Sequence, residues 1–271
     1  MPGHTVCDIT GANAVVVSAT YRQAPSATFP AQHEDADAAY EWIIENSGSF
    51  NADPERLALA GESAGGNLAL NVALHARDAQ LTQPDHVLSV YPIASDNMET
   101  RSYEAYADAT PLSRAGMEWF FSHVFENPSQ ASDPRVDLIE RDDLQGLPPV
   151  TLINAEIDPL QSEGEILAER LSAAGVEVEQ MTFDGVTHEF FGMAAVVPQA
   201  QEAVDMATAN LREAFGAEGA TDAAAADPAT PEAGEVSDGA TPDAMSPDSG
   251  DTAETYGTAE PAEGEAANPS N

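Results

Sequence analysis

The stretch Gly61-Glu62-Ser63-Ala64-Gly65 decides how this sequence is expected to fold. It follows a short apolar run at residues 57–60 and precedes residues 64–77, which are apolar on almost every side. A G-x-S-x-G sequence between a strand and a buried helix is typical of a tight turn that lifts a serine hydroxyl clear of a sheet. We expect strained backbone angles at Ser63 and glycines where side chains would clash. The turn also aims the first free N–H groups of the helix, that of Ala64 among them, at the oxygen of a reacting carbonyl.

Strand and helix signals alternate on both sides of this turn. Short apolar or β-branched runs predict strands, and longer segments with apolar residues at helical spacing predict helices. The expected strands are residues 14–19, 57–60, 87–91, 150–154 and 176–183, and the expected helices are residues 34–46, 64–77, 162–174 and 198–214. Strands that alternate with helices favour an α/β fold with a doubly wound, mostly parallel sheet.

Two segments depart from this alternation. Residues 97–146 hold an aromatic cluster around Trp119 and are expected to form an inserted lid or cap within a domain spanning residues 1–216. Residues 217–271 are rich in Ala, Thr, Pro, Gly, Asp and Glu and almost lack large apolar side chains. Such a segment cannot bury enough surface to offset the entropy lost on ordering. We therefore expect a disordered acidic tail, a solvated extension rather than a binding segment.

A nucleophilic serine needs a base, and the base needs a carboxylate that orients it. Asp158 lies just past the expected strand at residues 150–154, and His188 lies just past the one at residues 176–183. Because the carboxyl ends of parallel strands meet at one edge of a sheet, we expect Ser63, Asp158 and His188 to meet there. Their order along the chain is that of α/β-hydrolases.

Other residues of the same types compete for the roles of acid and base. Glu156 sits nearer the strand proper than Asp158, and Asp184 is too close to the base in sequence to belong to the preceding strand end. The remaining histidines have plainer places in helices, beside a strand, in the aromatic insert or in the terminus: His4, His33, His75, His86 and His123. We therefore favour Asp158 as the acid and His188 as the base.

Four blocks in order carry a resemblance to a known family. They are Tyr21-Arg22-Gln23-Ala24-Pro25 with Phe29-Pro30, then Gly61-Glu62-Ser63-Ala64-Gly65-Gly66-Asn67-Leu68, then Glu156-Ile157-Asp158-Pro159-Leu160, and His188-Glu189-Phe190-Phe191-Gly192. The sequence resembles the hormone-sensitive-lipase-like (bacterial family IV) esterases of the α/β-hydrolase fold. The resemblance implies hydrolysis of short-chain carboxylic esters through an acyl-serine intermediate, with neither metal nor cofactor. Glu189 stands where the family often has glycine.

One element of the family is missing from the sequence. These esterases carry an upstream His-Gly-Gly-Gly run whose N–H groups complete the oxyanion hole, whereas the only Gly-Gly here is Gly65-Gly66. The resemblance implies an N-terminally truncated fold that lacks its first strands and the strand between those at residues 14–19 and 57–60. One lost oxyanion donor costs about 3–4 kcal/mol of transition-state stabilisation, so impaired activity of the chain as given is one expectation. A true start upstream of Met1, as in a misassigned start or a fragment, is the explanation we favour for the missing run, and a decayed paralogue is the alternative.

Three functions remain open on the sequence alone. The first is a short-chain esterase that forms an acyl-enzyme at Ser63. The second is a catalytically inactive, truncated hydrolase scaffold with a binding role. The third keeps the same three residues but acts on peptides or lactones.

The charge of the chain limits its partners. It holds 47 acidic residues against nine basic ones, all arginine, and its net charge is −38. This charge repels nucleic acids and anionic membranes, and no apolar run approaches the roughly 18–20 residues of a membrane span. The single cysteine, Cys7, excludes an internal disulfide. We expect a small-molecule ester as partner, no metal, no cofactor and a cytoplasmic location, and we leave the oligomeric state open.

A surface of carboxylates without lysine is typical of proteins from salt-accumulating halophiles. Residues 217–271 hold 13 of the 47 acidic residues and no base, so the rest of the chain keeps 34 acids against nine arginines, a net charge of −25. The tail therefore accounts for only part of the excess. Self-repulsion of this size destabilises a compact state at low salt.

Salt should stabilise the folded chain. Raising KCl from about 0.1 M to about 1 M shortens the screening length from about 10 Å to about 3 Å, so the midpoint of thermal unfolding, followed by circular dichroism, should rise. A chain ending at residue 216 should show the same rise, because most of the negative charge lies before that residue. A midpoint that stays constant or falls in both chains would contradict the halophilic interpretation.

Overall fold

Four parallel strands form a sheet in which spatial order equals sequence order. The computed structural model describes residues 12–216, so the expected disordered tail lies outside the described residues. The strands are β1 (Ala58–Glu62), β2 (His86–Val90), β3 (Val150–Ile157) and β4 (Val178–Thr187). Ala58 pairs with His86, Val87 with Val150, and Val150 with Val178. All carboxyl ends therefore lie at one edge of the sheet.

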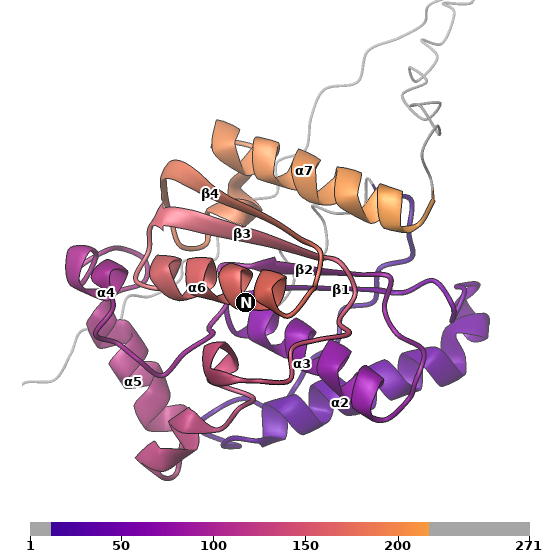
Figure 1. The fold of residues 1–271 in the computed structure, drawn as a ribbon, viewed down its shortest axis with the longest axis horizontal. Coiled ribbons are helices and arrows are strands. Elements are labelled where there is room, and N and C mark those ends of the chain that lie inside the picture. Colours follow the sequence, from indigo (N-terminus) through magenta and orange to yellow (C-terminus); the bar gives the residue numbers. More distant parts are fainter. Residues whose placement is uncertain (1–11, 217–271) are drawn as a thin grey trace, which may run out of the picture. The chain divides into compact units, whose positions relative to one another are not determined.

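Helices cover both faces of this sheet (Figure 1). The helices are α2 (Ala31–Asn46), α3 (Ala64–Asp78), α4 (Arg101–Ala105), α5 (Arg114–Val124), α6 (Gln161–Ala173) and α7 (Pro198–Ala214), with the 3-10 turns η2 (Ser47–Phe50), η3 (Pro128–Ser132), η4 (Leu138–Glu140) and η5 (Phe190–Met193). Helices α3 and α6 connect successive parallel strands, and right-handed crossovers place both on one face. Helix α7 follows the last strand and lies on the other face. The two-sided arrangement confirms the expected α/β sheet.

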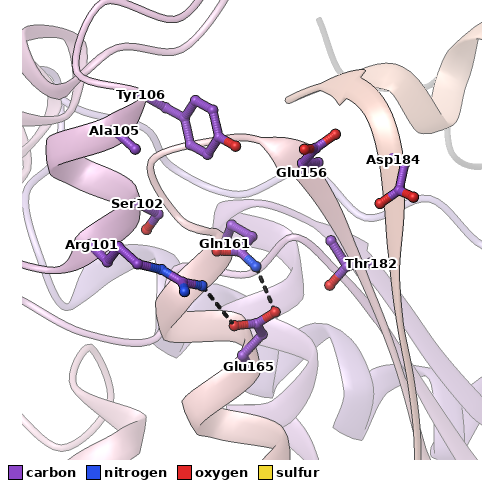
Figure 2. A pocket seen from close by; sticks show the side chains of 9 residues that line it. All are labelled: Arg101, Ser102, Ala105, Tyr106, Glu156, Gln161, Glu165, Thr182 and Asp184. Atoms are coloured by element: carbon purple, nitrogen blue, oxygen red, sulfur yellow. Dashed lines mark hydrogen bonds and ion pairs between the residues drawn. The ribbon is translucent and has the colours of Figure 1, made fainter.

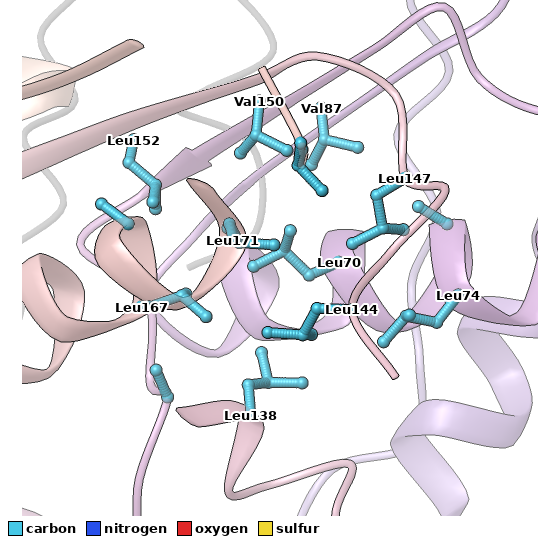
Figure 3. Packing of buried hydrophobic residues seen from close by; sticks show 14 of the residues in the cluster. Leu70, Leu74, Val87, Leu138, Leu144, Leu147, Val150, Leu152, Leu167 and Leu171 are labelled. Atoms are coloured by element: carbon cyan, nitrogen blue, oxygen red, sulfur yellow. The ribbon is translucent and has the colours of Figure 1, made fainter. Parts of the chain in front are cut away.

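The larger layers of the core lie on either side of β2 and β3. On one face, leucines of α3 and α6 interdigitate with apolar side chains of these strands (Figure 3). Leu152 and Leu167 are completely buried there. On the other face, α7 and η5 pack on β2, β3 and β4 through a second apolar cluster. Every residue of β2 is buried, which is the pattern of a central strand covered on both sides.

The prediction of a strand at residues 14–19 is wrong. These residues form no strand, and Val15 and Val17 are 55% and 42% exposed. A strand needs neighbouring N–H and C=O groups to pair with. Within the described residues the sheet begins at β1, whose only neighbour is β2, so no strand is available beside residues 14–19. The other four strands and the four expected helices are confirmed, with ends that shift by at most four residues.

Residues 97–146 interrupt the alternation, as the sequence predicts. They carry α4, α5, η3 and η4 instead of a strand. Helix α5 begins where the Ser113 hydroxyl accepts the Gly116 N–H at 3.0 Å, an ordinary N-cap. The aromatic residues of this segment differ in burial: Trp119 of α5 is 57% exposed, whereas Phe125, directly after the helix, is buried. Among the described residues, no helix combines the length and the apolar character needed to cross a bilayer.

Leu167 and its neighbour Ile166 provide a matched test of this packing. Leu167 is 0% exposed in the α3–α6 layer, whereas Ile166 is 37% exposed. Leu167→Ala should lower the free energy of unfolding by about 2–5 kcal/mol because it removes buried methyl groups and leaves a cavity. Ile166→Ala should change it by less than about 1 kcal/mol. Chemical denaturation of the two variants checks the difference, and equal losses would contradict the described burial.

Candidate active site

Ser63 occupies a strained turn between β1 and α3. Its φ of 56° and ψ of −116° lie outside the ordinary regions for a residue with a side chain. The Ser63 N–H donates to the carbonyl of Val90 at 2.8 Å, which fastens the turn to the end of β2. The turn thus presents the hydroxyl at the carboxyl edge of the sheet, as the G-x-S-x-G sequence predicts.

The two glycines that flank the serine differ in what they allow. A Cβ on Gly61 would lie 2.1 Å from the carbonyl oxygen of Gly65, which no side chain tolerates. A Cβ on Gly65 would meet no atom within 4 Å beyond its own helix and chain neighbours. The expected clash is therefore confirmed at Gly61 and wrong at Gly65, because Gly65 already lies in the first turn of α3 and faces open space.

Ser63, His188 and Asp158 form one chain of hydrogen bonds. Ser63 Oγ lies 3.0 Å from His188 Nε2, and His188 Nδ1 lies 2.7 Å from Asp158 Oδ2. A carboxylate only accepts hydrogen bonds, so the proton of the neutral imidazole sits on Nδ1 and leaves Nε2 as an acceptor for the serine hydroxyl. His188 is 4% exposed and Asp158 is 0% exposed. The arrangement can therefore remove the proton of Ser63.

Asp158 is held by the loop that leads into α6. Its Oδ1 accepts the N–H of Leu160 at 2.9 Å, so each of its oxygens has a donor. Of the competing carboxylates, Glu156 accepts the N–H of Gly185 at 2.7 Å and so ties the end of β3 to β4. Asp158 is the carboxylate that meets His188, in agreement with the choice made from the sequence.

The Tyr91 ring packs against the imidazole of His188, a contact that the sequence reasoning missed. Its ring centroid lies 4.4 Å from that of His188, and it is 1% exposed. The Tyr91 hydroxyl donates to the carboxylate of Glu62, the residue before Ser63. Burial, and then the charge of Glu62, raise the pKa of the phenol. The Tyr-Pro sequence directly after a buried strand was the available signal.

Two serines fasten the insert to the loop that carries Asp158. The Ser102 hydroxyl donates to the carbonyl of Pro159 at 2.6 Å, and the backbone N–H of Ser162 donates to Ser102 Oγ at 3.1 Å. The N–H of Ser102 in turn donates to Ser162 Oγ at 3.1 Å. Helix α4 is thereby fixed to the first turn of α6, directly after Asp158.

The remaining histidines of the described chain have partners outside this site. His33 meets Asn67, His75 meets Glu41, His86 meets Thr151 and His123 meets the Trp119 carbonyl. Burial lowers the pKa of His86 to about 4. Residues 12–216 contain no group of three or more His, Cys, Asp or Glu side chains that could hold a metal ion.

A hollow of about 460 Å³ lies between α4 and the ends of β3 and β4 (Figure 2). Its lining includes Arg101, Tyr106 and Glu156 and none of Ser63, Asp158 and His188. Arg101 and Gln161 both reach Glu165 across one side of it.

Comparisons with known proteins show what this chain is similar to. A family model described as alpha/beta hydrolase fold matches residues 2–192. Carboxylesterase NlhH of Mycobacterium tuberculosis is 37% identical over 209 residues, which cover 76% of this chain and 65% of that protein. Ethyl acetate hydrolase of Pseudomonas putida is 31% identical over 199 residues, 73% of this chain and 63% of that protein. The chain thus spans just under two thirds of the length of these relatives.

Solved structures show the same likeness. An esterase of Pyrobaculum calidifontis superposes with a TM-score of 0.74 at 34% identity, over 78% of this chain and 69% of that one. A carboxylesterase from a metagenomic library, EstE1, gives a TM-score of 0.74 at 34% identity, over 77% of this chain and 72% of that one. Sequence and structure therefore point to one family.

The two flanking glycines give a direct test of the turn. Gly61→Ala should lower the free energy of unfolding by about 3 kcal/mol or more, because the new methyl group overlaps backbone atoms that cannot move away cheaply. Gly65→Ala should leave it unchanged or raise it by up to about 1 kcal/mol, since alanine favours the helix over glycine. Urea denaturation of both variants is the measurement, and a harmless Gly61→Ala would show that the turn is built differently.

Proposed function

The chain belongs to the hormone-sensitive-lipase-like branch of the α/β-hydrolase family, and from this premise we propose that it hydrolyses short-chain carboxylic esters through an acyl-serine intermediate. The observation that carries the proposal is the hydrogen-bond chain from Ser63 Oγ through His188 to Asp158. An ordinary serine hydroxyl is a weak nucleophile, and a base at 3.0 Å gives it a place to lose its proton during attack.

In the acylation step, Ser63 Oγ attacks the ester carbonyl while its proton moves to His188 Nε2. Asp158 holds the ring by accepting the Nδ1 hydrogen bond and stabilises the imidazolium that forms. The negative charge that develops on the carbonyl oxygen lies near the start of α3, where the Ala64 N–H offers one oxyanion donor. The tetrahedral intermediate then collapses: the bond between its carbon and the leaving-group oxygen breaks as the imidazolium gives that oxygen its proton, the alcohol leaves, and the acyl group stays on Ser63.

Deacylation repeats these steps with water. His188 removes a proton from the water molecule as it attacks the acyl group on Ser63. The second tetrahedral intermediate collapses when His188 returns the proton to Ser63 Oγ, which releases the carboxylic acid. Ser63 and His188 each return to their starting protonation state at the end of the cycle, so the enzyme is ready for the next ester molecule.

A neutral ester of small size suits the charge of the site. Asp158, Glu62 and Glu189 all act on the buried Tyr91 ring beside His188, so the surroundings of the base are negative. A negatively charged acyl or alcohol group would be repelled there. The names of the relatives, a carboxylesterase and an ethyl acetate hydrolase, support the same class of substrate.

We further propose that residues 97–146 act as a lid within the domain of residues 1–216, supported by the Ser102–Ser162 contacts that fix α4 beside the acid.

Turnover of p-nitrophenyl acetate or butyrate in molar salt tests the proposal. Ser63→Ala should abolish release of p-nitrophenol above background. Asp158→Asn should lower kcat by about 10⁴-fold, because the amide favours the wrong tautomer of His188 while the geometry stays in place.

Asp184→Asn is the matched control, since this carboxylate was rejected as the acid. It should keep full activity. Equal turnover by the wild type and Ser63→Ala would remove Ser63 from the mechanism, and equal losses in the two aspartate variants would remove Asp158. Activity confined to amides or lactones would replace the ester by that class.

A further inference from the structure

Glu163 is a completely buried carboxyl group that the mechanism above does not use. It lies in the first turn of α6, five residues after Asp158, and is 0% exposed. Its Oε1 accepts the backbone N–H of Ala94 at 2.8 Å. Its Oε2 is buried and has no hydrogen-bond partner among the described residues. In water both oxygens of a carboxylate would accept hydrogen bonds, whereas in this site only Oε1 has a hydrogen-bond donor.

The groups that face Glu163 are acidic or neutral. Asp158 approaches it from the loop before α6, Asp137 from the segment before η4 and Tyr103 from α4, and the N–H groups of Ala94 and Ser95 face it from the segment after β2. No arginine or histidine of residues 12–216 forms an ion pair with it. An isolated ionised carboxylate in such surroundings is very costly, and the ordinary response is to bind a proton.

Asp158 and Glu163 differ in the partners available to them. Asp158 accepts the Leu160 N–H and meets the His188 ring, so its negative charge is compensated. Glu163 has backbone N–H groups alone and experiences the negative charge of Asp158. Burial, which is the main cause, raises the pKa of Glu163 well above its usual range. When two neighbouring buried acids share one site, the proton stays on the less well compensated one.

We propose that Glu163 is a positioning residue that stays protonated at neutral pH, and that in this uncharged form it ties the Ala94 backbone to the first turn of α6 behind Asp158. Ala94 lies between β2 and the insert at residues 97–146, so the bond joins the start of that insert to the loop of the acid. A neutral group leaves Asp158 as the charge that faces His188. An ionised group would place a second negative charge behind the acid.

The proposal fixes the sign of a pH effect on stability. In the unfolded chain Glu163 loses its proton near the usual value of about 4.3, whereas in the folded chain it keeps the proton to higher pH. The folded state then binds more protons than the unfolded state above that value. The contribution of Glu163 to the free energy of unfolding is therefore full below about pH 4 and declines as the pH rises toward the raised folded pKa.

Infrared difference spectroscopy of the full chain tests the protonation directly and needs no activity. The wild type minus Glu163→Gln at pH 7 should show the C=O stretching band of a protonated carboxyl group. Glu165→Gln is the matched control two residues along the same helix, where the side chain is 40% exposed and accepts from Gln161 at 2.5 Å. Its difference spectrum should show carboxylate bands instead. Carboxylate bands in the Glu163 difference would overturn the proposal.

Activity then separates positioning from simple filling of space, and this part rests on the proposed esterase function. Glu163→Ala should lower kcat about 10- to 100-fold with little change in KM, because the hydrogen bond that connects the Ala94 segment to the loop of Asp158 is lost. Glu163→Gln, which keeps an acceptor and a neutral donor, should restore that loss and show a weaker decline of unfolding midpoint between pH 5 and pH 9 than the wild type. Loss of kcat in the Gln variant equal to that in the Ala variant, or an unchanged pH dependence, would contradict the proposal. An inactive wild type that still shows the protonated band would refute the esterase function and leave the protonation of Glu163 standing.

Discussion

Asp158 is completely buried, and its Oδ2 lies 2.7 Å from His188 Nδ1. An ionised carboxylate at such depth is tolerated only when donors surround it, and here the imidazole and the Leu160 N–H supply them. The rest of the site follows from this contact. It sets the tautomer of His188, which leaves Nε2 free to accept from the Ser63 hydroxyl. It also compensates the charge of Asp158, which is why we place the proton of the neighbouring acids on Glu163. The turn at Ser63 is strained to bring its hydroxyl to His188 Nε2, and packing around β2 and β3 holds the strain in place.

Helices and strands could be predicted from the sequence where the pattern of apolar residues matches the pattern of burial in the fold. Helix α3 is apolar on nearly every side and is buried on nearly every side. Strands β2 and β3 are rich in apolar residues, and β2 is buried throughout and β3 over its first six residues. Residues 14–19 have the same β-branched pattern, yet they form no strand. A strand forms only beside another strand, and the sequence of residues 14–19 does not reveal whether such a partner is present. The clash predicted at Gly65 is wrong for a related reason, because the surroundings of this residue depend on the direction in which α3 leaves the turn.

The meeting of Ser63, Asp158 and His188 was predictable because each follows a strand, and parallel strands end at one edge. The supporting residues were not. Tyr91 reads as the last apolar residue of a strand, and only the contact of its ring with that of His188 gives it a second role. Glu163 reads as an acid in the first turn of a helix, where solvent exposure is the ordinary outcome. Its complete burial comes from the segment around Ala94, nearly seventy residues earlier in the chain. Such roles arise from contacts between distant segments, which no local pattern encodes.

Covalent labelling with a fluorophosphonate tests the central claim most directly, because the probe reacts only with a serine whose proton can be removed. The folded chain, incubated with the probe and mapped by peptide mass spectrometry, should carry a single adduct on Ser63. The rate of its formation should fall sharply in His188→Ala, since Nε2 lies 3.0 Å from the hydroxyl in the native site. A chain that is folded by circular dichroism but takes up no label, or that labels Ser63 equally fast without His188, would contradict the account.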